Sequence, residues 1–319
     1  MKADLQNPIF TDEAKAREAL EAMRWPDGPT CPHCGSVEGI AKAQGKAARP
    51  GLYYCAACND QFTATVGTVM ERSKIPLTKW WLAMHLLGTS KKGMSAHQLH
   101  RMLGITYKSA WFLCHRIREA MRDDNVPGFD PLGGKGKVVE ADETYFGNVP
   151  ESKRPTKTTS GRKFTKGGRS GPSGKRAVVA LVERGGRVRS FHPATADGNT
   201  VTAIVLDNIK RESRLHTDES RLYMFPGTEF KAHETVTHSH GEYVRGDVHT
   251  NTIEGVFSIF KRGMKGVYQH CSEKHLHRYL AEFDFRYNNR TALGVDDVTR
   301  VAKIAKGITG KRLTYRLPH

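Results

Sequence analysis

The sequence has 319 residues, of which 38% are hydrophobic and 26% are charged. This composition excludes a low-complexity or fibrous chain and indicates two or three globular domains. With 50 Lys and Arg residues against 33 Asp and Glu residues, the formal net charge is +17. Such a surface attracts polyanions, of which nucleic acid is the commonest large one; an anionic lipid surface, or solubility alone, is the alternative. No apolar run approaches the ~18 residues that span a bilayer, and residues 1–22 lack a signal-peptide core, so we expect a cytoplasmic location and no membrane partner.

Composition and hydrophobic spacing divide the chain into five parts. A short amphipathic helix is predicted from Asp12 to Arg24, followed by a lead-in rich in Pro and Gly. Apolar residues recur at helical spacing from Trp80 onward, and short runs typical of strands begin at Lys137. The predicted parts are residues 1–30, the N-terminal helix and lead-in; 31–75, a cysteine-containing domain; 76–126, a helical segment; 137–292, a mixed α/β domain; and 293–319, a basic tail.

Four of the six cysteines form two close pairs, each with the spacing Cys-x-x-Cys, and 20 residues separate the pairs. Each pair aims two thiolates at one point, and two pairs complete a tetrahedral site. In a reducing compartment this spacing favours metal over disulfides; a redox dithiol or chance pairing is the alternative. The intervening segment suits a β-hairpin. The pattern therefore predicts a zinc ribbon whose structural Zn²⁺ is held by Cys31, Cys34, Cys55 and Cys58.

A helix-turn-helix segment is predicted after the ribbon. Ser95 can cap a first helix, Gly104 supplies the sharp turn, and Thr106 can cap a second helix. In DNA readers of this kind the second helix lies in the major groove, whereas two helices joined at a glycine can also be an ordinary αα-corner. The net positive charge favours the DNA-binding interpretation. The predicted phosphate or base contacts on the second helix are Lys108, Arg116 and Arg118.

Two further stretches are strongly basic. Residues 148–176 carry nine Lys and Arg residues against the single acid Glu151, and they show no periodicity. They are interpreted as a flexible basic insertion, either a solvated loop or a cationic arm that grips phosphates. The tail of residues 293–319 has no acid after Asp297.

Acidic residues recur at points where strands and a helix are predicted. The strand from Lys137 to Gly147 alternates so that Glu140, Asp142 and Thr144 share one face, and a later short strand, Arg214 to Thr217, delivers Asp218. Taken singly, an acid at a strand end is as well explained as a turn or cap residue.

A third acid lies on a predicted helix, Asn251 to Arg262. Its apolar residues form a buried side, while Glu254, Ser258 and Lys261 share another stripe with Asn251 beside them. A carboxylate two turns before a lysine can hold a metal while the lysine holds a phosphate. Three acids in the order strand, strand, helix suit a two-Mg²⁺ site for in-line displacement at phosphorus.

These acidic segments carry a resemblance to a known family. The segments Glu140 to Thr144, His216 to Asp218 and His249 to Gly255 resemble the bacterial insertion-sequence transposases with an ISXO-like domain, which are D-D-E or D-D-N recombinases. Lys261-Arg262-Gly263, the segment Tyr279 to Asn288 and the cysteine pairs extend the resemblance over roughly residues 24–292. Val256-Phe257 stands where the family more often has Phe-Trp, a difference of packing.

The resemblance implies a ribonuclease-H-like catalytic domain of α/β (α+β) class behind an N-terminal zinc ribbon. It implies that Asp142 and Asp218 are the first two metal ligands and that Lys261 contacts DNA, with Arg262 beside it. The third ligand is Glu254 or Asn251; Glu254 is favoured because its charge suits a hard cation. The implied catalytic set is therefore Asp142, Asp218, Glu254, Asn251 and Lys261, with magnesium on Asp142, Asp218 and Glu254.

The implied activity is metal-dependent DNA cleavage followed by joining of a 3′-hydroxyl to target DNA. Two Mg²⁺ ions, which Mn²⁺ can replace, serve the chemistry, and Zn²⁺ is structural. The implied partners are the element's terminal inverted repeats, target DNA and further copies of the chain at the bacterial nucleoid. The alternatives are a non-catalytic DNA-binding regulator and a nuclease of the same fold that does not join strands.

Overall fold

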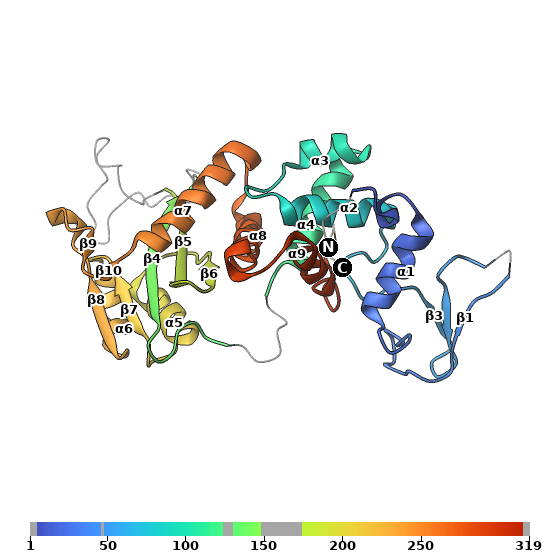
Figure 1. Ribbon diagram of the computed structural model, residues 1–319, viewed down its shortest axis with the longest axis horizontal. Helices are drawn as coiled ribbons and strands as arrows, with labels where there is room; N and C mark the ends of the chain where they lie inside the picture. The colour runs from blue at the N-terminus through green and yellow to red at the C-terminus, as the bar shows by residue number, and fades with distance from the viewer. Residues whose placement is uncertain (1–4, 46–47, 124–129, 148–173, 315–319) are drawn as a thin grey trace. The chain divides into compact units, whose positions relative to one another are not determined.

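The computed structural model describes residues 5–45, 48–123, 130–147 and 174–314. The chain forms two compact units, residues 1–124 together with 289–319, and residues 125–288 (Figure 1). Most of the predicted basic insertion, residues 148–173, lies outside the described residues. The described helices include none long and apolar enough to cross a bilayer.

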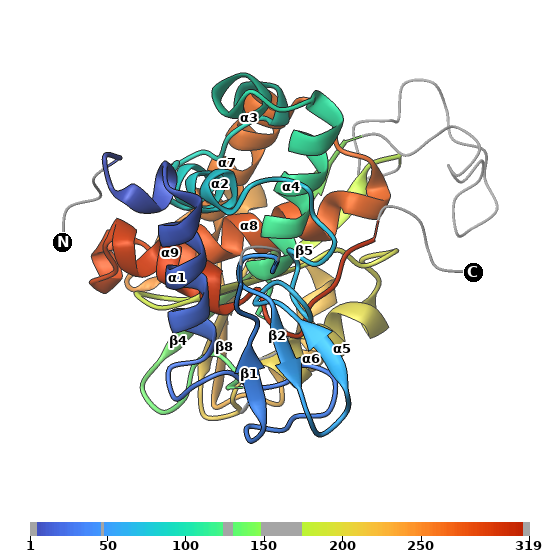
Figure 2. The same cartoon turned by 90° about the vertical axis from the view of Figure 1, so that its right-hand side faces the viewer.

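The first unit begins with a helix packed beside a small sheet. The helix α1 (Glu13–Arg24) is capped by Asp12, which accepts from the backbone N–H groups of Ala14 and Lys15. The strands β1 (Ile40–Lys42), β2 (Tyr53–Cys55) and β3 (Asp60–Phe62) form an antiparallel sheet in that order, which confirms the predicted hairpin and adds a third strand. Glu21 of α1 accepts from the Tyr53 hydroxyl at 2.8 Å, so the helix and the sheet form one body (Figure 2).

Three more helices complete the middle of this unit. They are α2 (Leu77–Thr89), α3 (Ala96–Leu103) and α4 (Tyr107–Ala120). The predicted caps are present, because the Ser95 hydroxyl accepts from Gln98 N–H and the Thr106 hydroxyl from Ser109 N–H. Gly104 ends α3 at φ +57°, a left-handed conformation that favours glycine. The predicted pair of helices joined at Gly104 is therefore present.

The C-terminal residues belong to the first unit rather than forming a tail. A short turn η7 (Thr291–Leu293) leads to α9 (Asp297–Lys306), which packs against α1, α2 and α4. The approach of α2 to α9 is close at Gly88, where a Cβ would lie 2.8 Å from Ile304 Cδ1. Ile304, Ala305 and Ile308 are buried, so the prediction of a basic tail over residues 293–319 is wrong over the described part. Lys303 and Lys306 lie on the exposed side of an amphipathic helix, whereas Arg300 is buried.

The second unit is built on a five-stranded mixed sheet of order β6-β5-β4-β7-β8. Its strands are β4 (Val138–Phe146), β5 (Arg176–Glu183), β6 (Val188–Phe191), β7 (Arg214–Thr217) and β8 (Ala232–Thr235). The first three pair antiparallel, with Gly185 and Gly186 in the turn between β5 and β6, whereas β7 runs parallel to β4 and β8.

Helices cover both faces of this sheet. The helix α5 (Gly198–Asn208) packs with Val139, Ala141 and Leu181 on one face. On the other face α7 (Asn251–Gly263) and α8 (Leu276–Asn288) pack with Val178, Ala180 and Val182 (Figure 1). Alternate residues of β5 therefore enter opposite cores, which explains why this strand reads as a continuous apolar run.

Short elements connect these layers. After β7 come η3 (Arg221–Tyr223) and α6 (Met224–Gly227). After β8 come η4 (His238–His240) and the hairpin of β9 (Val244–Arg245) with β10 (Val248–His249). A π-helical turn η5 (Met264–Tyr268) and η6 (Glu273–His275) link α7 to α8, and η1 (Pro8–Phe10) precedes α1. This arrangement is the ribonuclease-H-like α/β fold expected for the second unit, with the hairpin leading directly into α7.

Candidate metal centres

The two cysteine pairs meet at one point in the first unit. Cys31 Sγ lies 3.7 Å from Cys58 Sγ, and Cys34 Sγ lies 3.7 Å from Cys55 Sγ. All four sulfur atoms lie within 4.8 Å of one another, and in the described residues no other cluster of His, Cys, Asp and Glu side chains brings its ligand atoms this close. Four thiols and no further donor fit a closed tetrahedral zinc site. The predicted structural Zn²⁺ site is thus present in the fold, with both pairs contributed by turns beside the ribbon strands.

The predicted acids come together in the second unit through strand register. In the parallel pair of β4 and β7, Glu140 lies opposite His216, so Asp142 within β4 and Asp218, directly after β7, lie at the same level of the sheet. Asp142 Oδ1 accepts from Glu143 N–H at 2.7 Å, and Asp218 Oδ1 accepts from Ser220 N–H at 3.0 Å. Both side chains are half-buried.

The third predicted acid stands on the first turn of α7. Glu254 is exposed, and its Oε1 accepts from the Thr250 hydroxyl at 3.1 Å. His238 Nε2 lies 3.8 Å from the same oxygen. Asn251 is exposed one turn earlier, and Lys261 is half-buried two turns later. The stripe predicted from helical spacing is therefore present on α7.

Electrostatics connects these acids. Burial, followed by the charges of Asp218, Glu143 and Glu254, raises the pKa of Asp142 to about 8. Burial also raises the pKa of Asp218, against a lowering contribution from His238. The carboxylates are close enough for their charges to interact. They are not grouped as tightly as the cysteine sulfur atoms. A group of half-buried like charges with hard oxygen donors is a fitting environment for divalent cations, which favour the charged carboxylates.

Comparison with known proteins gives separate matches for the zinc ribbon and for the second unit. Residues 131–288 match the family model described as the ISXO2-like transposase domain, and residues 11–61 match the transposase zinc-ribbon domain. The chain is also 30% identical over 281 residues to the "Uncharacterized protein in transposable element ISH50" of Halobacterium salinarum, covering 87% of this chain and 91% of that protein. The chain belongs to the ISXO2-like transposase family. The catalytic-domain match coincides with the second unit.

Similarity to a solved structure is weaker. A chain of the simian T-cell lymphotropic virus intasome in complex with PP2A regulatory subunit B56 gamma shows 13% identity and a TM-score of 0.27. The match covers 58% of the transposase-family chain and 63% of the intasome chain. A TM-score this low carries no argument about the fold.

The predicted DNA-contacting residues of the transposase-family chain differ in exposure. Lys108 is exposed on the first turn of α4, and Arg262 is exposed at the end of α7 with its Nε donating to Ser258 O at 3.2 Å. Arg116 and Arg118 are only 9% and 2% exposed, and the Arg116 guanidinium lies over the Phe112 ring. Burial argues against the DNA contacts predicted for these two arginines. Their charge suggested a surface role, but α4 is enclosed by the unit's own core on that side.

Several residues near the acids were missed by sequence reasoning. Glu143 points to the opposite face of β4 from Asp142, where it accepts from the Tyr223 hydroxyl at 2.8 Å, and burial raises its pKa. His238 faces Glu254, with its Nε2 3.8 Å from Glu254 Oε1. Glu140 was placed on the same face as Asp142, but nothing in the sequence showed that it is fully buried.

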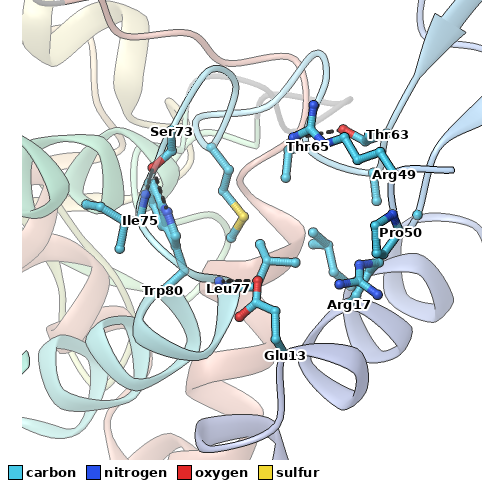
Figure 3. A pocket seen from close by; sticks show the side chains of 14 residues that line it. Glu13, Arg17, Arg49, Pro50, Thr63, Thr65, Ser73, Ile75, Leu77 and Trp80 are labelled. Carbon is cyan, nitrogen blue, oxygen red and sulfur yellow. Dashed lines mark hydrogen bonds between the residues drawn. The ribbon is translucent and has the colours of Figure 1, made fainter. Parts of the chain in front are cut away.

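A cavity in the first unit of the transposase-family chain is lined by none of the predicted site residues. It has a volume of about 230 Å³ and is bounded by α1, the ribbon loop and the start of α2, with Arg17 and Arg49 at its wall (Figure 3). Glu13, also at its edge, accepts from Leu77 N–H at 2.9 Å and Thr78 N–H at 3.2 Å. The Glu13 carboxylate thus serves as the acceptor for the first N–H groups of α2, because Pro76 at the N-cap position offers no side-chain cap. The cavity thus lies where α1, the ribbon and the start of α2 meet in the first unit.

Proposed function

We propose that this insertion-sequence transposase cleaves DNA strands at the ends of its element and joins the freed 3′-hydroxyl to target DNA. The observation that carries the proposal is the convergence of Asp142 and Asp218 at the same level of the sheet, with the charge of Glu254 acting on Asp142. We assign the metal-binding role to these three acids, with Mg²⁺ as the natural ion and Mn²⁺ as a substitute.

Two divalent ions bound there supply a polarised nucleophile and stabilise the leaving oxygen of an in-line displacement. The protein's part is to hold charge and substrate in place. Asp142 keeps a proton near neutral pH when no cation is present, so the site is arranged to exchange that proton for a metal. Glu254 is preferred to Asn251 as the third ligand because a carboxylate charge suits a hard cation.

Substrate contact is assigned to basic residues outside the acid cluster. Lys261 stands two turns after Glu254 on α7, and we assign it to a phosphate next to the cleaved bond. In the first unit, the exposed start of α4 with Tyr107 and Lys108 is the end of a recognition helix that normally meets base edges. We infer that the ribbon and this helix pair bind the terminal inverted repeats. A homo-oligomer on DNA is part of the proposal, since two element ends must be cut together.

A strand-transfer assay tests the proposal. The full chain is incubated with a labelled duplex carrying its own element end and a target plasmid, with Mg²⁺, with Mn²⁺ or without divalent metal. Metal-dependent joined product is expected. Cleavage without joining would replace the proposal with a nuclease of the same fold, and tight binding with neither product would replace it with a regulator.

A further inference from the structure

Glu140 is a fully buried carboxylate two residues before Asp142 on the same face of β4. A charge withdrawn from water is costly unless it is paired and hydrogen-bonded. Here each oxygen has partners: Oε1 accepts from the Thr252 hydroxyl at 2.8 Å, and Oε2 accepts from Ile253 N–H at 3.0 Å. Both partners lie in the first turn of α7. Glu140 therefore attaches the start of that helix to strand β4.

This attachment takes the place of an ordinary cap. Thr250, at the N-cap position of α7, makes no side-chain hydrogen bond to the helix backbone. The first N–H groups of a helix lack partners within the helix and favour a negative charge. Glu140 supplies that charge from another element 113 residues away in sequence. The position of α7, and of Glu254 one residue after Ile253, thus depends on a contact to the sheet.

Arg184 is the counter-ion of Glu140 and extends the contact to two more segments. Its Nε and Nη2 donate to Glu140 Oε1 at 3.0 and 2.8 Å. The same guanidinium donates to the backbone carbonyls of Asp247, at 2.8 Å, and His249, at 3.2 Å. It also lies 3.4 Å from Nδ1 of His216 on β7. One ion pair therefore joins β4, β7 and the hairpin that leads into α7.

Each proposed metal ligand follows a residue held by this pair. Asp142 comes two residues after Glu140, and Asp218 comes two residues after His216. Glu254 comes directly after Ile253. We propose that Glu140 and Arg184 are positioning residues that fix the three acids in their metal-binding arrangement, an inference that rests on the proposed function of Asp142, Asp218 and Glu254. Neither side chain is a ligand, since each is engaged by the protein's own groups.

Replacing Glu140 by Gln tests this role with little change in volume. The amide keeps one acceptor oxygen but turns a donor toward either Arg184 or Ile253 N–H, so one side of the contact is lost. Residues that orient metal ligands typically change metal affinity 10- to 100-fold when they are altered. We expect Glu140→Gln to weaken Mn²⁺ binding at least about tenfold. Thr252→Val, which removes a single hydrogen bond, is expected to produce a smaller shift in the same direction and serves if Glu140→Gln folds poorly.

The matched control is Glu282→Gln. Glu282 is also fully buried in the second unit, where it pairs with Arg286 and accepts from the Tyr268 hydroxyl at 2.6 Å. Its loss removes the same kind of ion pair on α8, away from the strands that carry the acids. A general loss of stability therefore affects both variants, whereas a positioning role affects metal binding only in Glu140→Gln.

The experiment measures Mn²⁺ binding to the zinc-loaded full chain with a duplex of its element end, from the electron paramagnetic resonance signal of free Mn²⁺. Binding to an Asp142→Asn, Asp218→Asn double variant is subtracted. A tenfold weaker affinity in Glu140→Gln, with Glu282→Gln unchanged, supports the inference. Equal affinities in Glu140→Gln, Thr252→Val and the wild-type chain overturn it. If the wild-type chain binds no more Mn²⁺ than the double variant, the proposed acid site itself is wrong.

Discussion

The zinc ribbon and the proposed acidic metal site are built in opposite ways. The ribbon's ligands come from two short turns separated by one hairpin, and their sulfur atoms already lie within 4.8 Å of one another. The acids come from two strands and a helix spread from Asp142 to Glu254, and they meet only because β4 pairs with β7 and α7 is attached to β4. A local site can be found from spacing, whereas a site assembled from distant segments depends on the fold.

The two centres also differ in what they need from the protein around them. The ribbon has a small core, so its metal supplies much of the folding free energy. The second unit has two apolar clusters, one on either side of its sheet, and neither includes the acids. Its half-buried carboxylates oppose one another in the absence of a cation. Zinc binding is therefore expected to stabilise the ribbon, whereas the carboxylates without a cation are expected to destabilise the second unit.

The largest expected effect is loss of zinc from the ribbon. Cys34→Ser should release the metal and unfold the ribbon, because zinc binding in domains of this kind is worth on the order of 10 kcal/mol. Zinc content measured by atomic absorption should fall, and trypsin should cleave within residues 31–62. Cys271→Ser, in the second unit, is the control and should retain zinc. A Cys34→Ser chain that keeps both its zinc and its protease resistance would contradict the four-cysteine site.

The next effect is on catalysis. Asp142→Asn and Asp218→Asn should each reduce strand cleavage and joining at least about a thousandfold, because the carboxylate charge that holds metal is removed without a change of shape. The assay is the joined product formed from a labelled element end, with DNA affinity measured in parallel. Asp207→Asn, an exposed acid on α5, should leave the activity unchanged. Near wild-type activity in either site variant would break the assignment.

A pH-dependent effect on stability follows from the raised pKa of Asp142. In the folded, Mg²⁺-free protein the pKa is about 8, whereas the unfolded chain titrates near its ordinary value of 3.8. The unfolded state therefore loses its proton first, and stability falls as pH rises from about 4 to 8. Asp142→Asn removes this loss, so the variant should be more stable than wild type at pH 8 by on the order of 1–2 kcal/mol, allowing for partial exposure.

Urea unfolding of the second unit at pH 5 and pH 8, with zinc retained and no Mg²⁺ added, measures this difference. Adding Mg²⁺ should reduce the difference at pH 8, since bound cation replaces the proton. A wild-type chain whose stability at pH 8 equals that of Asp142→Asn would show that the carboxylates do not strain the fold.

The smallest expected effect is at the start of α4. Lys108→Ala should weaken binding to the element end about three- to tenfold and reduce the salt-dependence slope of log K by about 1, as expected for one lost phosphate contact. Arg118→Met should leave that slope unchanged and instead lower stability by about 1–3 kcal/mol, because a buried guanidinium and its packing are removed. Fluorescence anisotropy at several salt concentrations separates the two. The opposite pattern would restore Arg118 as a DNA contact.

Much of the local structure was predictable from the sequence. The strand at Arg214–Thr217 and the start of α7 at Asn251 agree with the predictions, because the spacing of their apolar residues marks them directly. The caps Ser95 and Thr106 and the turn at Gly104 were equally clear. The division into parts failed at the C-terminus, since a charge count does not reveal that Ile304 and Ile308 pack inside the N-terminal unit.

By itself the sequence determined the zinc ligands, the family and the acids to consider, because cysteine spacing and short motifs encode chemistry within a few residues. Only the tertiary structure decided which charges work at a surface and which are interior. It buried Arg118, and it turned Glu140 from a neighbour of Asp142 into the contact that holds α7. The physical reason is that burial and ion pairing depend on which distant segments lie opposite each residue, and sheet register sets that order.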